Sequence, residues 1–413
     1  MRKFLYLFLL FALSANAEVV EIDGIFYDLK PVKVGTAQVT YDHKIPSNHE
    51  YTGDINIPSQ IEYEGNTYIV DGIGDNAFGA DYELISVTLP NTIQTIGSDS
   101  FWACRNLKSI NIPSSVKTIE RQAFKDCEGL QEVHISDINS WCQIEFNDYS
   151  NPLYYAHRLY IGDKEITDLV IPDDVTSITN RAFNGFSALK SVRLGSGLKS
   201  LGNYAFAWCS SLSSVIIPEN VTEIGLCAFY ECTNLTSLSL SPNISIISKE
   251  AFAYCSSLEE VRIPYGVTEI DTWAFRYCKN LKRIYIAESV QKIGDCAFGW
   301  CENISDVYCQ AVTPPTYIYT WHWDTSQFFY NSYPDYATLH VPESSLDSYK
   351  NAFSWQNFGS FVVLSNEETA IKSVKSTDKR EYYTLDGVKK DSPRNGLNII
   401  KLQDGTVKKI VVK

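Results

Sequence analysis

The chain has 413 residues, more than one compact core usually accommodates, which leaves either several domains or an elongated repeat architecture. Hydrophobic residues make up 45% and charged residues 20% of the sequence, and these values exclude a disordered or fibrous protein. The formal net charge of −14 at pH 7 makes nucleic acid an unfavourable partner, because the phosphate backbone repels an acidic surface.

Residues 1–17 have the composition of a secretory signal peptide. A basic pair, Arg2 and Lys3, opens the segment, and the apolar run 4–13 and the small residues of a cleavage site at 15–17 follow. A membrane-spanning helix needs about 20 apolar residues, and neither this run nor any other in the sequence is long enough. We therefore predict a secreted or outer-cell-surface protein with no transmembrane segment in the mature chain.

An Ala-Phe pair, once replaced by Ser-Phe, recurs along the chain in two blocks with a spacing of 23 residues. The pairs begin at Ala77, Ser100, Ala123, Ala182, Ala205, Ala228, Ala251, Ala274 and Ala297. The surrounding pattern is L-x-x-V-x-I-P-x-x-V-x-x-I-x-x-x-A-F-x-x-C, as in residues 212–232, and nine units fit it. A fixed period of this length indicates a repeat architecture.

Each unit predicts one short strand followed by a turn. Apolar residues alternate at period two, as at Val215 and Ile217, and a proline that cannot donate a further ladder hydrogen bond usually follows. One unit cannot bury its apolar side alone, but units stacked about 4.8 Å apart align Leu, Val, Ile, Ala and Phe into a continuous core. The predicted fold is a β-rich solenoid of about nine such units.

The motif IPxxVxxIGxxAFxxCxxL, carried from Asp71 to about Cys309, resembles the BspA-like leucine-rich repeat. The flanking segments are similar to the family's caps, which keep the ends of a stacked core from water. The resemblance implies a leucine-rich-repeat solenoid at 71–310, an N-terminal cap at 18–70 and a C-terminal cap at 311–364. It also implies a bacterial cell-surface protein, with extracellular-matrix and plasma proteins as candidate ligands.

One unit is longer than the others. The spacing between Ala123 and Ala182 is 59 residues rather than 23, which places an insertion at about 136–166. The insertion is rich in aromatic residues, namely Trp141, Tyr149, Tyr154, Tyr155 and Tyr160. Similar elongated units recur in the family that the repeats resemble, which favours a structural role, and contact with a partner is the alternative.

Eleven cysteines in an exported chain would ordinarily indicate a disulfide framework. Seven of them instead share one repeat position, where Phe186 stands in the long unit; they are Cys104, Cys127, Cys209, Cys232, Cys255, Cys278 and Cys301. Parallel stacking holds neighbouring Cβ atoms about 4.8 Å apart, beyond the roughly 3.5–4.5 Å of a disulfide, so we predict free, buried thiols. The sequence leaves open a disulfide among the others, Cys142, Cys227, Cys296 and Cys309.

The sequence contains none of the local motifs of common enzymes. Its six histidines are scattered, and HExxH, GxSxG and GxxxxGK[ST] do not occur. The repeat spacing also lacks a C-x-x-C pair with histidines beside it, as a zinc site would need. We therefore predict a protein that is not an enzyme, with no cofactor and no bound metal.

One strand position of each unit points outward and forms a column on the predicted sheet face. In the second half of the column an arginine and two tyrosines follow one another, and Arg and Tyr concentrate binding energy at interfaces. An ordinary solvated sheet face is the alternative. The candidate ligand-binding residues here, including neighbours one outward step earlier, are Arg193, Arg262, Arg283, Tyr285, Asp306 and Tyr308.

A second aromatic column directly precedes the cysteines. Its candidate ligand-binding residues are Trp208, Tyr254, Tyr277 and Trp300. After the last unit, Trp321 and Trp323 flank a histidine and are candidates for a sugar platform. The alternative for the column is packing over the turns between units, and for the tryptophan pair it is covering the end of the core.

Residues 365–413 form a separate compositional unit, with eleven Lys and Arg against seven Asp and Glu. From Glu381 onward, short alternating segments are separated by Asp386-Gly387, Asn395-Gly396 and Asp404-Gly405, which are hairpin turn signals. We predict a linker and a small β tail. It is similar to the C-terminal sorting domains of type IX secretion cargo, which implies a role in crossing the outer membrane; a remnant fold without a working secretion system is the alternative.

These features predict an exported, non-enzymatic, adhesin-like protein that presents a leucine-rich-repeat surface to extracellular protein or glycan ligands. A carbohydrate-binding surface protein that uses Trp and Tyr platforms is the alternative function.

Overall fold

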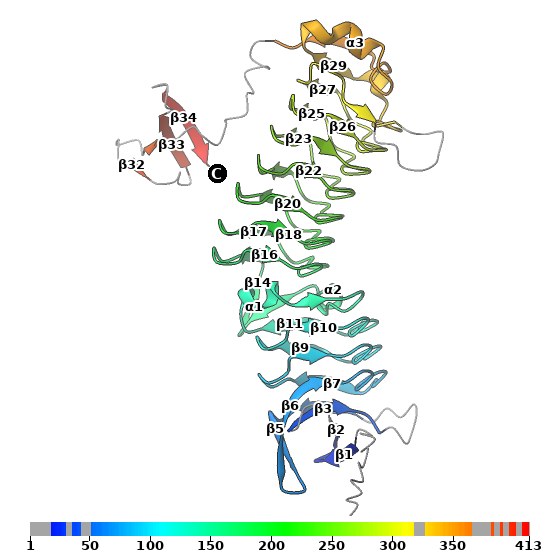
Figure 1. Cartoon of the computed structure of the whole chain (residues 1–413), viewed down its shortest axis with the longest axis vertical. Helices are drawn as coiled ribbons and strands as arrows, with labels where there is room; N and C mark the ends of the chain where they lie inside the picture. Colours follow the sequence, from blue (N-terminus) through cyan, green and yellow to red (C-terminus); the bar gives the residue numbers. More distant parts are fainter. Residues whose placement is uncertain are drawn as a thin grey trace, which may run out of the picture.

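The computed structural model describes most of the chain. The described residues are 18–29, 35–42, 51–317, 327–365 and the backbone of four strands between 381 and 412. The predicted signal peptide and the candidates Trp321 and Trp323 lie outside them. In the described part the chain forms a long solenoid of stacked turns with little helix, which confirms the predicted β-rich solenoid (Figure 1).

One side of the solenoid, the first ladder, is built from the strands predicted in each repeat. They pair in parallel with a register of one unit, as Val261 with Ile284 and Arg262 with Tyr285. The strands are β4 (Gly53–Asn56), β7 (Leu84–Thr88), β9 (Ser109–Ile112), β11 (Glu132–Ile135), β13 (Leu159–Ile161), β15 (Asp168–Val170), β17 (Ser191–Arg193), β19 (Ser214–Ile216), β21 (Ser237–Ser239), β23 (Glu260–Ile263), β25 (Arg283–Ile286), β27 (Asp306–Cys309), β29 (Thr338–Val341) and β30 (Ser360–Val363).

A second ladder of very short strands forms another side. Most of these strands have two residues, the first exposed or half-buried and the second buried, as Glu223 and Ile224 are, because the chain turns inward at the repeat isoleucine. The strands are β6 (Asn66–Ile73), β8 (Thr95–Ile96), β10 (Thr118–Ile119), β12 (Glu145–Phe146), β16 (Ser177–Ile178), β18 (Ser200–Leu201), β20 (Glu223–Ile224), β22 (Ile246–Ile247), β24 (Glu269–Ile270), β26 (Lys292–Ile293) and β28 (Thr316–Tyr317).

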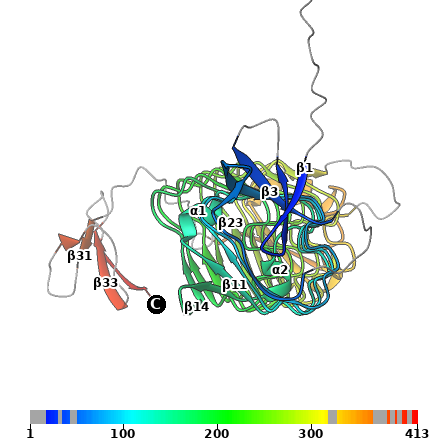
Figure 2. The same cartoon turned by 90° about the horizontal axis from the view of Figure 1, so that it is seen from below.

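The Ala-Phe turns form the third side, which we call the turn edge. The backbone N–H of Phe229 donates to the carbonyl of Ala251 in the next turn at 2.8 Å, and the same bond recurs between other units. The phenylalanine rings stack inside the solenoid with centroids 4.9–5.6 Å apart. Viewed along the axis, the turns lie over one another around this core (Figure 2).

The seven cysteines that share a repeat position are free and buried, as predicted, and the other four, for which the sequence left a disulfide open, are free and buried as well. The seven that share a repeat position have a contact that the sequence analysis did not foresee. Each thiol donates to the carbonyl of the phenylalanine in the preceding turn, with Sγ–O distances of 2.9–3.3 Å. The cysteine is therefore a hydrogen-bond donor between turns as well as an apolar filler.

The insertion forms a further, longer turn of the solenoid. Its strand β12 joins the second ladder beside β10, and its strand β13 joins the first ladder beside β11. Helix α1 (Ile138–Cys142) brings Trp141 into the core, 5.1 Å from the ring of Phe146. Helix α2 (Leu153–Ala156) lies over the next turn at Gly185, where a Cβ would come within 2.6 Å of the Cα of Tyr154. The antiparallel hairpin of β13 with β14 (Lys164–Ile166) ends one section of the first ladder, which continues after it in further separate sheets.

Both ends of the phenylalanine stack are covered by aromatic rings. Tyr51 packs 4.7 Å from Phe78 at the N-terminal end, beside the antiparallel strands β1 (Glu18–Ile22), β2 (Ile25–Leu29) and β3 (Thr36–Thr40) and the strand β5 (Gln60–Tyr63). At the other end Phe329 meets Trp355 and Phe358 at 5.8 and 5.2 Å. The C-terminal segment also contains the 3-10 helices η1 (Pro334–Tyr336) and η2 (Glu343–Ser345) and helix α3 (Leu346–Lys350). Its strands β29 and β30 continue the first ladder, so this cap is itself an extension of the solenoid.

The tail contains four antiparallel strands in the order β32-β31-β33-β34. Their bounds are β31 (Glu381–Tyr383), β32 (Lys389–Lys390), β33 (Gly396–Lys401) and β34 (Val407–Val412). Within the described residues, no helix has the length and apolarity of a membrane span.

Candidate ligand-binding surfaces

The outer face of the first ladder carries four planar side chains in one stack, which we call the Arg-Tyr stack: Arg262, Tyr285, Tyr308 and His340. The Arg262 guanidinium carbon lies 3.8 Å from the Tyr285 ring centroid. The rings of Tyr285 and Tyr308 are 4.6 Å apart and 7° from parallel, and those of Tyr308 and His340 are 4.2 Å apart. Parallel pairing with a register of one unit produces this stack, because it sets equivalent side chains directly beside one another.

Carboxylates beside the Arg-Tyr stack hold its Arg and His side chains in place by hydrogen bonds. Glu260 accepts from Arg262 at 2.7 Å and from Arg283 at 2.9 Å, and the hydrogen bond that Arg283 donates to Glu260 raises the pKa of the Arg283 guanidinium. His340 Nε2 lies 2.9 Å from Asp306 Oδ1. These charge-assisted contacts hold the side chains in a defined arrangement before any ligand arrives.

Five of the six residues predicted on this face are brought together at the stack. The exception is Arg193, which is separated from Arg262 along the column by Ile216 and Ser239 and lies 3.6 Å from Asp173. The sequence analysis missed His340, which the structure places in register with Tyr308. The segment Leu339-His340-Val341-Pro342 carries the same strand-then-proline signal as the repeats, and reading it as a further unit would have found the histidine.

The aromatic column of the turn edge is also stacked. Trp208, Tyr254, Tyr277 and Trp300 all have left-handed backbone with φ of 58–61°, a conformation imposed by the turn in unit after unit. Tyr254 and Tyr277 lie 4.7 Å apart, and Tyr277 and Trp300 lie 5.0 Å apart, with nearly parallel planes. Tyr230 joins Trp208 to Tyr254 at 5.3 and 5.2 Å.

Further groups extend and cover this aromatic column. Tyr154 from the insertion approaches Trp208 at 5.9 Å, and Tyr330 closes the other end against Trp300 at 5.0 Å. The Arg276 guanidinium lies 4.5 Å from the Trp300 ring. Neighbouring rings and this guanidinium therefore occupy the ring faces, and the column offers mainly ring edges to a ligand.

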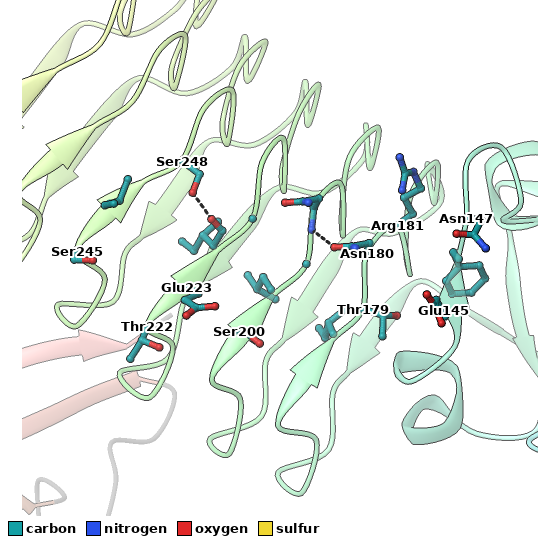
Figure 3. Close-up of a pocket in the computed structure, with 18 residues that line it drawn as sticks. Glu145, Asn147, Thr179, Asn180, Arg181, Ser200, Thr222, Glu223, Ser245 and Ser248 are labelled. Atoms are coloured by element: carbon teal, nitrogen blue, oxygen red, sulfur yellow. Dashed lines mark hydrogen bonds between the residues drawn. The ribbon is translucent and has the colours of Figure 1, made fainter. Parts of the chain in front are cut away.

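A polar groove of about 720 Å³ follows the second ladder from Glu145 in the insertion to Ser248 (Figure 3). This volume lies in the range of ligand sites, about 300–1,000 Å³. Its walls come from successive turns, and the side chains that Figure 3 labels are carboxylates, amides, hydroxyls and one guanidinium. The sequence analysis did not identify this groove, because it depends on the bend after the second ladder and on the shape of the insertion.

The structure offers little for metal or nucleophile chemistry. Among the described residues, no three His, Cys, Asp or Glu side chains gather as a metal site would require. Burial raises the pKa of the Cys255 thiol to about 12, and the other cysteines of its column are buried in the same way. Such thiols stay protonated at neutral pH and are poor nucleophiles.

Parallel stacked turns, each with an L-x-x-V-x-I strand on one side and an apolar core inside, define a leucine-rich-repeat solenoid. The model of the BspA type leucine rich repeat region matches the chain in 6 copies, over residues 53–153, 157–282 and 268–375. The chain belongs to this family.

Several solved structures are similar to the chain. A leucine rich cell surface protein from Faecalibacterium prausnitzii is 25% identical, with 71% of this chain and 94% of that chain covered and a TM-score of 0.36. A leucine-rich repeat protein from Bacteroides ovatus is 22% identical over 84% and 76%, with a TM-score of 0.40. The pneumococcal vaccine antigen PcpA is 15% identical over 84% and 99%, with a TM-score of 0.47. The comparison with curated proteins finds no match.

Proposed function

We propose that this protein is exported and works outside the cell as a non-enzymatic, adhesin-like binding protein, with the Arg-Tyr stack as the centre of a protein-binding face. The observation that carries the proposal is the continuous stack on the outer sheet face, in which Arg262 is exposed, Tyr285 and Tyr308 are half-buried and His340 is buried. Rigid Tyr and Arg side chains give large contact areas at a low entropic cost. Extracellular proteins of a host or of neighbouring cells are the ligands we propose.

Export is part of the same proposal. We propose that residues 1–17 act as a signal peptide and that the tail 365–413, whose described strands form an antiparallel sheet, acts as a sorting domain. The family includes cell-surface proteins, of which the similar protein from Faecalibacterium prausnitzii is one by its description. A non-enzymatic role fits the buried, protonated thiols and the absence of common catalytic motifs from the sequence.

The proposal favours a protein ligand over a sugar at the predicted Trp and Tyr platforms. A sugar ring packs on an open aromatic face, whereas the faces of Tyr254 and Tyr277 cover each other at 4.7 Å. The same holds for Tyr285 and Tyr308 in the Arg-Tyr stack. Ring edges with hydroxyl groups and a guanidinium suit the mixed polar and apolar surface of a protein.

The test is a pull-down of extracellular host and microbial material with the mature chain, followed by affinity measurement on the captured protein. The double change Arg262→Ala and Tyr285→Ala should weaken binding at least about tenfold, because truncated hot-spot residues typically cost 2 kcal/mol or more each. The matched control is Arg105→Ala with Tyr82→Ala, an exposed cation–π pair elsewhere on the solenoid with a 5.6 Å separation. Equal affinities for the two double variants would show that the face is wrongly chosen.

A further inference from the structure

Two asparagines in the groove present their amide groups in a fixed orientation. Asn180 Oδ1 accepts from the backbone N–H of Asn203 at 2.7 Å, and Asn203 Oδ1 accepts from the backbone N–H of Leu226 at 2.8 Å. Both residues are exposed, and within the described part of the chain neither Nδ2 has a partner. Because the backbone bond fixes each oxygen, the N–H donors are already ordered for a ligand.

Acceptors and hydroxyl groups line the same groove, on the turns of these donors and on neighbouring turns. Glu145 and Glu223 bring exposed carboxylates, and Ser200, Thr222 and Ser245 bring hydroxyls (Figure 3). Donors and acceptors therefore recur along the axis, turn after turn. A ligand that fits must both donate and accept hydrogen bonds and must repeat along its length, as the hydroxyl groups of an extended sugar chain do.

The charges and the apolar content of the groove exclude other ligand classes. Its one guanidinium, on Arg181, is bound to Asp148 at 2.6 Å, so the free carboxylates of Glu145 and Glu223 would repel a polyanion. Phe146 is the only aromatic lining residue and is buried, and Ile246 is the one large apolar side chain that is exposed. Protein interfaces depend on exposed aromatic and arginine anchors, whereas here the one lining arginine is paired with Asp148 and the one lining aromatic residue is buried.

We propose that the groove along the second ladder binds an extended, neutral oligosaccharide. Sugar hydroxyls accept from the amides of Asn180 and Asn203 and donate to the carboxylates of Glu145 and Glu223. This site lies on a different side of the solenoid from the Arg-Tyr stack, and it does not rest on the protein-binding function proposed above. The protein would then hold a glycan and a protein ligand on separate faces.

The test removes the donors and leaves the fold intact. In the double variant Asn180→Asp and Asn203→Asp each side chain keeps the Oδ1 acceptor for the backbone but loses its Nδ2 donor. The native chain already contains this arrangement, since Asp75 accepts from the N–H of Ser98 at 2.8 Å in the same repeat position. An unchanged thermal unfolding midpoint would establish that the double variant folds.

The mature wild-type chain is titrated calorimetrically with neutral hexasaccharides of glucose, xylose, mannose and N-acetylglucosamine. We expect at least one to bind and the double variant to bind it about tenfold or more weakly, as two lost hydrogen bonds imply. Glu223→Gln should lower the affinity for the same hexasaccharide. Asp75→Asn, which adds an amide outside the groove, should leave that affinity unchanged.

Two further outcomes keep this proposal distinct from the protein-binding one. The variant Arg262→Ala with Tyr285→Ala should bind the hexasaccharide as the wild type does, even if it binds no protein. The proposal is overturned if none of the four sugars binds at low millimolar concentration, or if the Asn180→Asp, Asn203→Asp variant binds with wild-type affinity. Loss of a protein ligand in that variant, with no sugar bound by the wild type, would instead assign the groove to a protein.

Discussion

At the scale of single residues, the repeat cysteine joins neighbouring turns. Its sulfur fills the core, and its S–H group donates to a phenylalanine carbonyl, as from Cys255 to Phe229 at 3.3 Å. The regular spacing was enough to predict a buried, free thiol. The hydrogen bond could not be predicted, because it depends on where the turn directs a backbone carbonyl that the sequence pattern does not reveal. Phe186 occupies this position without a donor, so packing is the part of the role that every unit needs.

The buried thiol predicts how stability depends on pH. Burial raises the pKa of Cys255 from 9.0 to about 12, so its contribution to stability is complete below about pH 9 and is lost as the pH rises toward 12. In that window the unfolded chain releases the proton while the folded chain retains it. Each such thiol should lower the free energy of unfolding by about 1.4 kcal/mol per pH unit.

Urea unfolding between pH 7.5 and 10.5 under reducing conditions measures this effect. Cys255→Ala should be less stable than the wild type at pH 7.5, because it loses packing and a hydrogen bond. Above pH 9 the free energy of unfolding of Cys255→Ala should fall less steeply with pH than that of the wild type. The two slopes should differ by about 1.4 kcal/mol per pH unit. Tyrosines and lysines ionise in both proteins and cancel in the comparison, so parallel curves would mean that the thiol is accessible to ionisation in the fold.

At the scale of elements, the ladders follow directly from the repeat, whereas the insertion does not. Period-two alternation identified the strands, and a constant spacing identified their register, so the column of Arg262, Tyr285 and Tyr308 could be predicted as neighbours. In the insertion the period is lost, and no local signal indicates that β12 and β13 enter the two ladders. The groove was missed for the same reason, since its wall at Glu145 belongs to β12.

The insertion should contribute to stability as a full turn does. Trp141 is 1% exposed, and its indole N–H donates to the carbonyl of Ala182 at 2.8 Å in the next turn. Trp141→Ala should lower the free energy of unfolding by about 3–5 kcal/mol, because it opens a cavity between two turns. Tyr149, 63% exposed in the same insertion, is the matched control, and Tyr149→Ala should change the value by no more than about 0.5 kcal/mol.

Chemical denaturation of the two variants gives the comparison. Similar, small losses for both would mean that the insertion is an appendage whose tryptophan is not required between the turns.

At the scale of the whole molecule, the solenoid and the tail differ in architecture and in charge. The solenoid is built from parallel ladders, whereas the tail strands are all antiparallel. The tail sequence is basic, and the remainder of the mature chain is strongly acidic. Composition and turn signals predict this division, but they carry no information about whether a secretion system recognises the tail.

A truncated chain that ends at Leu364 tests whether the tail is needed for folding of the solenoid or for its exposure at the cell surface. The truncated protein should keep the thermal unfolding midpoint of the solenoid, because each turn contacts mainly its neighbours. It should no longer be degraded when intact producing cells are treated with protease, because it would remain behind the outer membrane. Protease sensitivity equal to that of the full chain would argue against a sorting role for residues 365–413.

The sulfur atoms inside the turns also constrain how the molecule can be made. If the chain is exported, as proposed above, it exposes all eleven thiols until successive turns close over them. An oxidising enzyme that acted before the turns had formed would join cysteines of different turns by disulfide bonds. The solenoid could not then complete its folding. Maturation therefore requires anoxic surroundings, or winding that outpaces oxidation.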